Sequence, residues 1–331
     1  MRIAVDAMGG DRAPEVIVQG VLEAVAEWGI EVTLVGRREA ILNALEGGHK
    51  NIEVHHCEGV VQMDESPLKA VRKKKDASIR IAFDLVKKGE VDAVVSAGNS
   101  GATLAAGVLI LGKLESVQRP AIASIFPGEQ GEVILIDVGA NVDCRPEHLF
   151  QFGIMAHAFA TSCLGIGDPK IGLLSIGEEG GKGNEQVRLA HTLFKNSPLN
   201  FIGNVEGRDI LSGKAQIIVC DGFVGNVALK LSEGMAEAIV RTVGSELAKS
   251  FLGRVGLFLG RRAFGGFKKK FDYAEYGGAP ILGMKGIGVV CHGGSSARAI
   301  KNAVKMAATF VKNDIQTRQA LQLAEFQGKG A

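Results

Sequence analysis

Residues 171–194 read IGLLSIGEEGGKGNEQVRLAHTLF, and the order of residue types in this stretch predicts how the chain folds. The first part, residues 171–176, is mostly apolar and stops at Gly177, as expected for a short buried strand. A glycine-rich loop follows. From Asn184 onward the apolar residues have the spacing of an amphipathic helix, with asparagine at a favoured first position. Strand, glycine-rich loop and helix in this order form one unit of an α/β fold.

The same unit recurs along the chain. Other short runs rich in β-branched residues are continuously apolar, which is typical of parallel strands covered on both faces. The predicted strands are residues 3–5, 32–35, 93–95, 121–125, 133–136, 171–176, 217–219 and 288–290. The predicted helices are residues 14–28, 77–87, 101–111, 146–163, 184–194, 226–248 and 296–311. We therefore expect a three-layer α/β/α protein with a mainly parallel sheet, as a single domain over residues 1–331 with room for two lobes.

Composition and charge exclude several classes of protein. The chain has 331 residues, of which 46% are hydrophobic and 22% charged, so it can bury a full core and is not disordered. Its formal net charge of +2 gives no reason to expect nucleic-acid binding. Its five cysteines form no C-x-x-C pair, which favours reduced thiols in the cytoplasm. No apolar run suits a signal peptide or a membrane-spanning helix, so we expect a cytoplasmic location.

Six loops that follow predicted strands combine glycine with polar residues. In open α/β sheets, ligands bind outside the carboxyl ends of the strands, and we expect all six loops at the same end of one sheet. The loops are residues 6–11, 96–102, 137–141, 177–184, 220–226 and 291–296. Glycines let backbone N–H groups approach an anion, and helix N-termini add partial positive charge. Because Lys182 adds the only full positive charge in these loops, the pattern predicts a site for a phosphate-sized anion.

Known nucleotide, metal and hydrolase motifs are missing from the sequence. There is no G-x-G-x-x-G, and GVLILGKL at residues 107–114 resembles a P-loop but has Leu114 where Ser or Thr binds Mg²⁺. There is also no H-E-x-x-H, no Cys/His spacing that suits zinc and no G-x-S-x-G. We therefore expect no cofactor, no metal and no covalent serine nucleophile.

Several blocks of the sequence resemble one enzyme family, the PlsX-type phosphate acyltransferases of bacterial phospholipid synthesis. The resembling blocks include MRIAVDAMGGD at residues 1–11, DVGAN at 137–141, GEEGGKGN at 177–184, GNVEGRDI at 203–210, DGFVGN at 221–226 and HGGSSARAI at 292–300. The resemblance runs from Met1 to about Val304. Arg12 stands where a histidine is common in the family, and Ser175 where an asparagine is common. Since arginine stays protonated, we expect no acid–base role at position 12.

The resemblance implies a reaction, a fold and a set of partners. The implied reaction converts acyl-[acyl carrier protein] and inorganic phosphate into acyl phosphate and free carrier protein, without a cofactor. Phosphate is then both the anion that the loops suit and the nucleophile. The implied fold is like that of the isocitrate and isopropylmalate dehydrogenases, in a homodimer that is loosely attached to the membrane.

The loops and the resemblance together give the candidate site residues. The candidate catalytic residues are Lys182, Asn226, Asn184 and His292. The candidate phosphate- or substrate-binding residues are Gly9, Gly10, Asn99, Gly139, Asn141, Glu178, Asp221 and Gly225. We expect Lys182 to balance the charge of phosphate, Asn226 to donate from its amide to phosphate or the oxyanion, and Glu178 to orient Lys182. The ordinary alternatives are a solvated surface lysine, a first-turn acid, and helix N-caps at Asn99, Asn184 and Asn226.

Two surface segments suggest partners. Arg72, Lys73, Lys74 and Lys75 form a basic run that suits docking of the acidic carrier protein, or else is a solvated helix end. Residues 250–273 interleave phenylalanines with cations and contain many glycines, which predicts a flexible projection that binds an anionic membrane surface. Its candidate membrane contacts are Leu257, Phe258 and Phe264. The alternative is a core or dimer-interface segment.

Three other functions remain open at the level of sequence. The first is a phosphate acyltransferase that uses acyl-coenzyme A. The second is a dehydrogenase on the same scaffold, although its carboxylate cluster and adenine-nucleotide loop are not found in the sequence. The third is a non-enzymatic membrane scaffold, which explains residues 250–273 but not the six polar loops.

Overall fold

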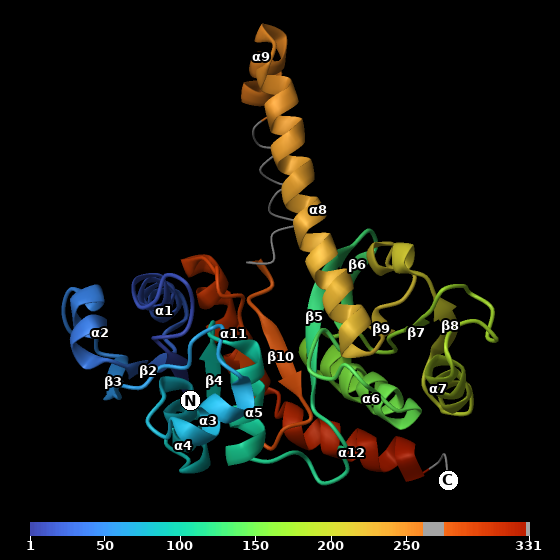
Figure 1. Cartoon of the computed structure of the whole chain (residues 1–331), viewed down its shortest axis with the longest axis horizontal. Helices are drawn as coiled ribbons and strands as arrows, with labels where there is room; N and C mark the ends of the chain where they lie inside the picture. Colours follow the sequence, from blue (N-terminus) through green and yellow to red (C-terminus); the bar gives the residue numbers. More distant parts are fainter. Residues whose placement is uncertain (261–274, 329–331) are drawn as a thin grey trace.

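The computed structural model describes residues 1–260 and 275–328, in which one eleven-stranded sheet lies between helices (Figure 1). The strand order is β3-β2-β1-β4-β11-β10-β5-β6-β9-β7-β8. The strands are β1 (Arg2–Asp6), β2 (Glu31–Gly36), β3 (Ile52–His56), β4 (Ala93–Ser96), β5 (Ala121–Gly128), β6 (Gly131–Ile136), β7 (Ile171–Leu174), β8 (Phe201–Val205), β9 (Ile217–Val219), β10 (Ala279–Leu282) and β11 (Ile287–Val290). The prediction of an α/β fold with a mainly parallel sheet is confirmed.

The helices connect most of these strands and include several that the sequence pattern did not predict. They are α1 (Glu15–Trp28), α2 (Arg38–Leu45), α3 (Pro67–Lys73), α4 (Ser78–Lys87), α5 (Ser100–Ile110), α6 (Pro146–Cys163), α7 (Glu185–Lys195), α8 (Gly222–Ala248), α9 (Phe251–Leu259), α11 (Ala297–Lys312) and α12 (Ile315–Gly328), with one 3₁₀ helix, η1 (Gly207–Leu211). No helix in these described ranges is both long and apolar enough to cross a membrane.

The sheet contains two parallel sets of strands that run in opposite directions. In one set β3, β2, β1, β4 and β11 are parallel, and in the other β6, β9, β7 and β8 are parallel. Three antiparallel pairings, β11 with β10, β10 with β5 and β5 with β6, separate the two sets. The expectation that all six glycine-rich loops share one end of one sheet is therefore wrong. The structure divides them into two groups, one for each parallel set.

Both faces of the sheet are buried, as the continuous apolar runs predicted. Ile3 and Val5 belong to one core cluster, whereas Ala4 between them belongs to the other. In the opposite half, Ile217 and Ile218 also point to different clusters. Residues of α1, α6, α7 and α11 fill the first cluster, and residues of α3, α4 and α5 fill the second. Since each cluster extends through both halves, the layers form a continuous α/β/α sandwich.

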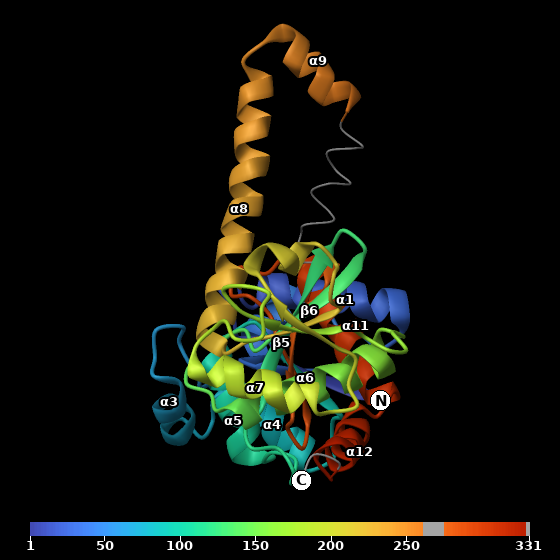
Figure 2. The same cartoon turned by 90° about the vertical axis from the view of Figure 1, so that its right-hand side faces the viewer.

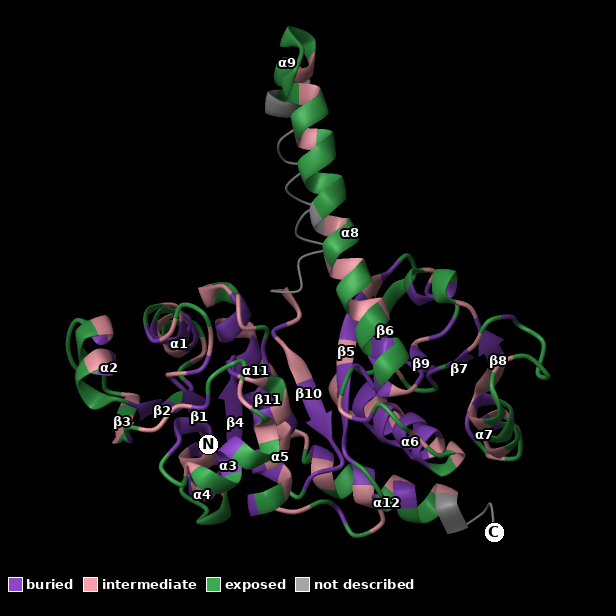
Figure 3. Cartoon of the chain, viewed as in Figure 1, coloured by how far each residue is buried: buried purple, intermediate pink, exposed green. Residues whose placement is uncertain are grey.

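Helix α8 extends away from the layered body, and α9 lies at its far end (Figures 1 and 2). Most of α8 beyond its first turns is exposed or half-buried, as the colouring in Figure 3 shows. The expectation that glycines prevent a preformed helix after Ser250 is wrong for Phe251–Leu259, because these residues form α9. The Ser250 hydroxyl accepts a hydrogen bond from the Gly253 N–H at 2.9 Å and so caps the helix. Phe264, a predicted membrane contact, lies outside the described residues.

Candidate functional site

Two hydrogen bonds, one from the backbone and one from a side chain, join the loop after β1 to the loop after β11. The Asp11 N–H donates to the Gly293 carbonyl at 2.9 Å, and the Arg12 guanidinium donates to the Ser295 carbonyl at 3.0 Å. At Gly9, an added Cβ would lie 2.7 Å from the backbone nitrogen of Gly98 in the loop after β4. Glycine is therefore required for these loops to approach one another. Arg12 acts here as a link between loops.

Asp6, the last residue of β1, is a buried acid that shapes this first group of loops. Its carboxylate accepts hydrogen bonds from the Ser96 hydroxyl at 2.8 Å and the Met8 N–H at 3.1 Å. Burial raises the pKa of the Asp6 carboxyl above its ordinary value, against the lowering effect of its hydrogen bonds. Part of the N–H array predicted to hold an external anion is therefore occupied by an internal carboxyl group.

Asp137, just after β6, has the same function in the second group. Its buried carboxyl accepts hydrogen bonds from the backbone N–H groups of Ile122 at 3.0 Å, Ala140 at 3.1 Å and Asn141 at 2.6 Å. The Gly139 N–H and the Asn141 side-chain amide also donate to it, at 3.3 and 3.0 Å. Burial raises the pKa of the Asp137 carboxyl. The prediction that the Gly139 and Asn141 N–H groups bind an anion is therefore wrong, because both groups donate hydrogen bonds to the Asp137 carboxylate.

The first turn of α8 packs closely on the Asp137 loop. The Gly222 N–H donates to the Asn141 carbonyl at 2.7 Å, and a Cβ at Gly222 would lie 2.8 Å from a carboxyl oxygen of Asp137. A Cβ at Gly225 would collide with the Asp137 carbonyl. Gly225 is therefore better explained as a packing glycine than as a phosphate ligand.

Asn226 is not the N-cap of α8. Asp221 has this function, because its carboxylate accepts a hydrogen bond from the Val224 N–H at 2.9 Å. Asn226 lies one turn further along, is exposed, and has no hydrogen-bond partner for its amide among the described residues. A methyl group added to Gly139 would lie 3.6 Å from its Cβ and 3.7 Å from its Oδ1. The capping explanation for Asn226 is thus wrong, and its amide is accessible to a ligand beside Gly139.

Lys182 is exposed in the loop after β7, and its ammonium group forms no ion pair within the described part of the chain. Its backbone N–H donates to the Glu179 carbonyl at 2.9 Å, which closes a tight turn. Glu178 forms an ion pair with Lys214 at 2.7 Å, so the expectation that Glu178 orients Lys182 is wrong. Asn184 caps α7 by accepting from the Val187 N–H at 2.9 Å.

Lys182 and Asn226 come from neighbouring parts of the sheet. Strands β7 and β9 pair in parallel, with Leu173 opposite Val219. The loop that carries Lys182 follows β7, and helix α8, which carries Asn226, follows β9. The carboxyl ends of neighbouring parallel strands lie at the same edge of a sheet. The structure therefore brings an ammonium group and a side-chain amide to one edge, together with the positive end of α7.

Asn99 and His292 belong to the other group of loops. The Asn99 amide caps α5 through the Ala102 N–H at 3.0 Å and donates to the Met63 carbonyl at 3.0 Å, so its ordinary capping role is confirmed. His292 is exposed, and its Nδ1 accepts a hydrogen bond from the Gly294 N–H at 3.1 Å. The four candidate catalytic residues therefore split between the halves, with His292 apart from Lys182, Asn184 and Asn226.

Metal ligands and reactive thiols do not gather at these loops. In residues 1–260 and 275–328, no group of three or more His, Cys, Asp and Glu side chains is placed to hold a metal ion. Burial raises the pKa of Cys57 and Cys144 to about 12 and that of Cys163 to about 11. It also raises the pKa of Cys291 to about 12 and that of Cys220 well above its ordinary value. Thiols of this kind stay protonated near neutral pH and are poor nucleophiles.

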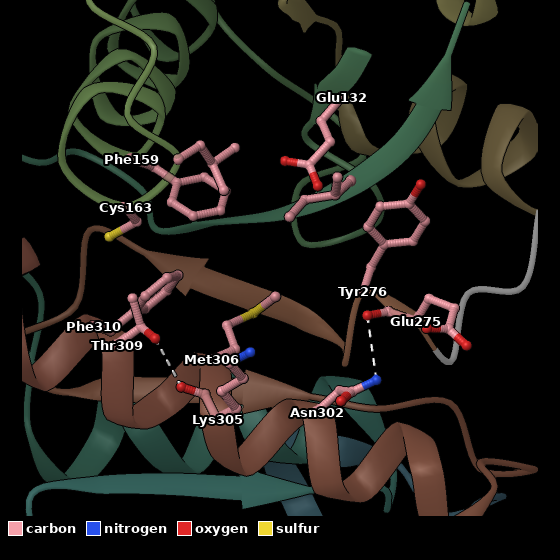
Figure 4. Close-up of a pocket in the computed structure, with 12 residues that line it drawn as sticks. Glu132, Phe159, Cys163, Glu275, Tyr276, Asn302, Lys305, Met306, Thr309 and Phe310 are labelled. Atoms are coloured by element: carbon pink, nitrogen blue, oxygen red, sulfur yellow. Dashed lines mark hydrogen bonds between the residues drawn. The ribbon is translucent and has the colours of Figure 1, made fainter. Parts of the chain in front are cut away.

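A cavity of about 260 Å³ lies between α6, α11 and the β5–β6 hairpin (Figure 4). Phe159, Met306 and Phe310 form an apolar side of this cavity, and Glu132 and Lys305 add charged groups. None of the predicted site residues lines it. The two loop groups, and not this cavity, are therefore the candidate site.

The fold and the loops define a class of α/β proteins that carry glycine-rich loops at the carboxyl ends of parallel strands, where ligands bind in open α/β sheets. A family model described as a fatty acid synthesis protein matches residues 1–318. The chain is 52% identical over 328 residues to a phosphate acyltransferase of Citrifermentans bemidjiense, covering 98% of this chain and 93% of the relative. It is 53% identical over 328 residues to a phosphate acyltransferase of Geotalea uraniireducens, covering 98% and 95%. The chain belongs to this family of phosphate acyltransferases, which confirms the resemblance seen in the sequence.

Solved structures show the same fold at low sequence identity. A phosphotransacetylase from Streptococcus pyogenes aligns with a TM-score of 0.63 at 18% identity, covering 94% of each chain. A 4-hydroxythreonine-4-phosphate dehydrogenase from Klebsiella pneumoniae aligns with a TM-score of 0.53 at 14% identity, covering 94% of this chain and 97% of the other. The second likeness confirms the prediction of a dehydrogenase-like fold.

The site residues that sequence reasoning missed are the two buried acids, Asp6 and Asp137. Each lies at the end of a buried strand and directly before a glycine-rich loop. An acid at such a position has to find donors nearby, because a buried polar group is costly when unpaired. This signal was present in the sequence and identifies both residues as organisers of their loops.

Proposed function

We propose that this protein transfers an acyl group from acyl-[acyl carrier protein] to inorganic phosphate, producing acyl phosphate for phospholipid synthesis. The observation that carries the proposal is the exposed ammonium group of Lys182, which has no acidic partner among the described residues and follows the strand next to that of Asn226. An unneutralised cation beside a free amide suits a small anion. The names of the relatives support phosphate as that anion.

In this reaction a phosphate oxygen attacks the thioester carbonyl carbon, and the carbon–sulfur bond breaks. Lys182 balances the charge of phosphate as it loses water and approaches the carbonyl. The Asn226 amide donates to the oxyanion or to phosphate, and one such donor typically contributes about 2.7–4 kcal/mol to catalysis. The leaving thiolate has a pKa of roughly 8.5, so it takes up a proton near neutral pH without a strong general acid.

The acyl donor can be tested directly against the main alternative. Purified protein is incubated with hexadecanoyl-[acyl carrier protein] or hexadecanoyl-coenzyme A, each with and without inorganic phosphate, and the loss of thioester is measured. We expect phosphate-dependent loss of the carrier-protein thioester and a much smaller loss of the coenzyme A thioester. Preferential use of coenzyme A supports the alternative donor. No loss of either thioester favours a non-enzymatic scaffold.

We also propose that the protein is a homodimer that associates through α8. Every fourth residue along this helix is a large apolar residue that is exposed in the single chain, namely Phe223, Val227, Leu231, Met235, Ile239 and Val243. A stripe of this length is unusual for a monomer in water and suits burial against a second copy of the same helix. Sedimentation of wild type and of a Leu231→Glu, Met235→Glu variant tests this, with a dimer expected only for wild type.

A peripheral membrane location is proposed for the end of the α8–α9 projection. Phe251, Leu252 and Leu259 of α9 are 73%, 81% and 76% exposed, at the point farthest from the layered body (Figure 2). Arg254 on the same helix is also exposed. Exposed apolar groups next to a cation suit the interface of an anionic bilayer.

A further inference from the structure

Asn204 connects the sheet to the turn that carries Lys182. Its side-chain N–H donates to the Glu179 carbonyl at 2.9 Å, and the Lys182 backbone N–H donates to the same oxygen at 2.9 Å. Asn204 is only 3% exposed and lies on β8, where it pairs with Leu173 of β7. The turn is therefore fastened to a rigid, buried element at the carbonyl that fixes the backbone of Lys182.

The other contacts of this turn are weaker. Glu178 pairs with Lys214, but the two side chains are 54% and 43% exposed, and ion pairs between such exposed groups contribute little. Gly180 and Gly181 are exposed, and Gly183 has a φ of +99°, a conformation that favours glycine. Glycine-rich segments lose much conformational freedom when they are ordered. Asn204 is thus the buried anchor of a segment with little intrinsic order.

Stability alone is a poor explanation for an asparagine at this position. The Oδ1 atom of Asn204 is buried and accepts no hydrogen bond within the described ranges. An unpaired buried acceptor destabilises a fold, whereas an apolar side chain of similar size avoids that penalty. The amide is better explained by the single hydrogen bond that it donates to Glu179.

We infer that Asn204 is a positioning residue for Lys182: by holding the Glu179 carbonyl, it fixes the turn and the direction in which the ammonium group meets phosphate. This inference rests on the proposed function. It assigns a role to a residue that has no access to phosphate itself, because its side chain is enclosed between β8 and the turn.

The test uses Asn204→Leu, which removes the donor at similar size, with Asn200→Leu as a matched control. Asn200 lies just before β8 and donates to the Asp168 carboxylate at 2.8 Å, away from the turn. With hexadecanoyl-[acyl carrier protein] and inorganic phosphate, we expect Asn204→Leu to lower kcat about tenfold or more, because misplacement of a catalytic group is costly. Its melting temperature is expected to equal or exceed that of wild type. Asn200→Leu is expected to keep wild-type turnover.

A double variant separates positioning from a general structural effect. If Asn204 acts through Lys182, adding Asn204→Leu to Lys182→Ala lowers kcat no further than Lys182→Ala alone. The inference is contradicted if the two substitutions lower kcat additively in the double variant. It is also contradicted if Asn204→Leu has wild-type turnover while Lys182→Ala has lost turnover. In both cases the proposed function stands. Wild-type turnover of Lys182→Ala overturns the role of Lys182 and this inference together. If Asn204→Leu does not fold, Asn204→Ala, which cannot overpack, is judged by the same criteria.

Discussion

Lys182 and Asn226 supply the two kinds of group that the proposed reaction needs. Lys182 offers a full positive charge that no described acid neutralises, and Asn226 offers an amide that no described group engages. Both follow neighbouring strands of the second parallel set. In the proposed reaction both groups reach phosphate and the oxyanion from one edge of the sheet, and Asp137 organises the neighbouring loop after β6.

Replacement of Asn226 by aspartate tests its donor role. Asn226→Asp keeps the size of the side chain but replaces a donor by a negative acceptor that repels phosphate. We expect turnover to fall about 100-fold or more, on the scale of losing one oxyanion donor. Stability is expected to change little, because Asp221 and not Asn226 caps α8. Asn196→Asp, at an exposed position after α7, is the control. Equal activity of Asn226→Asp and wild type removes Asn226 from the site.

Residue types and their spacing predicted the glycine-rich loops after the strands, but not which polar groups in these loops lack a partner within the protein. The N–H groups of Gly139 and Asn141 match the pattern of an anion site, yet they donate hydrogen bonds to the Asp137 carboxylate. Glu178 stands close to Lys182 in sequence, yet it pairs with Lys214. Hydrogen-bond partners depend on which segments the fold brings together, and a single sequence does not contain that information.

At the scale of the elements, the sequence predicted eight of the eleven strands but neither β3, β8 and β10 nor the directions of the strands. An apolar run looks the same whichever way the strand runs, so the reversal at β10 and β5 was missed. One signal was available, because only residues 126–132 separate the predicted strands 121–125 and 133–136. A parallel connection needs a dozen or more residues, so this short link requires an antiparallel hairpin. The hairpin is what separates the two groups of loops.

Helix α3 carries the basic run that was predicted to dock the carrier protein. Arg72 and Lys73 are exposed, but Lys74 is held by the Glu65 carboxylate at 2.6 Å and the Val60 carbonyl at 2.8 Å. Lys74 is therefore unavailable to a partner. The proposed docking surface therefore consists of the exposed side chains of Arg72, Lys73 and Lys75.

Charge reversal on α3 tests this surface. We expect Arg72→Glu with Lys73→Glu to raise the KM for acyl-[acyl carrier protein] about fivefold or more at low salt and less at high salt, because long-range attraction to an acidic partner is screened by ions. The value of kcat is expected to stay near that of wild type. Lys87→Glu with Lys88→Glu, at the exposed end of α4, is the control. An unchanged KM at low salt excludes the α3 surface.

His148 makes α6 sensitive to acid. It is only 4% exposed, and its Nδ1 accepts a hydrogen bond from the Arg145 N–H at 3.0 Å. Burial lowers the pKa of His148, and the positive charges of Arg119 and Arg145 lower it further. The unfolded chain has an ordinary histidine pKa of about 6.5. Stability from this site is therefore present above about pH 6.5 and is lost as the pH falls, since the unfolded state then binds a proton more readily.

His148→Gln keeps an acceptor but cannot become charged. We expect the thermal unfolding midpoint of wild type to fall more than that of His148→Gln between about pH 7.5 and about pH 5.5. His49→Gln, at an exposed position, is expected to follow wild type. Parallel curves for His148→Gln and wild type contradict the assignment.

At the scale of the whole molecule, the layered body and the projection have separate proposed tasks. The body holds the loops, whereas α8, which is 27 residues or about 40 Å long at the rise of an α-helix, extends from the body beyond its first turns. The sequence predicted a projection at residues 250–273, but in the structure the projection begins within α8, beyond the first turns of that helix. The helix at residues 226–248 was predicted, but its projection from the body was not, because an amphipathic pattern does not reveal whether the apolar face packs on the same chain or on another one.

Membrane binding is predicted to depend on the exposed face of α9. Wild type is expected to sediment with anionic liposomes at low salt and to dissociate at high salt. Leu252→Glu with Leu259→Glu should abolish sedimentation while turnover with soluble substrates persists, because both residues lie far from the loops. Leu189→Glu with Leu321→Glu, at exposed positions on the body, is the control. If the α9 variant still sediments, or wild type never does, the membrane role of the projection is wrong. The side chains of Leu257 and Phe258, two contacts predicted from the sequence, lie outside the described part of the chain, and a Leu257→Glu, Phe258→Glu variant tests them by the same sedimentation assay.

The most direct test of the central claim follows phosphate into the product. Purified protein is incubated with hexadecanoyl-[acyl carrier protein] and radiolabelled inorganic phosphate, and labelled acyl phosphate is measured together with free carrier protein. We predict equal amounts of the two products from wild type, a rate at least about 100-fold lower from Lys182→Ala, and a near wild-type rate from Lys214→Ala, whose side chain pairs with Glu178. Carrier release without labelled acyl phosphate, or a Lys182→Ala rate equal to that of wild type, contradicts the proposed chemistry at this loop.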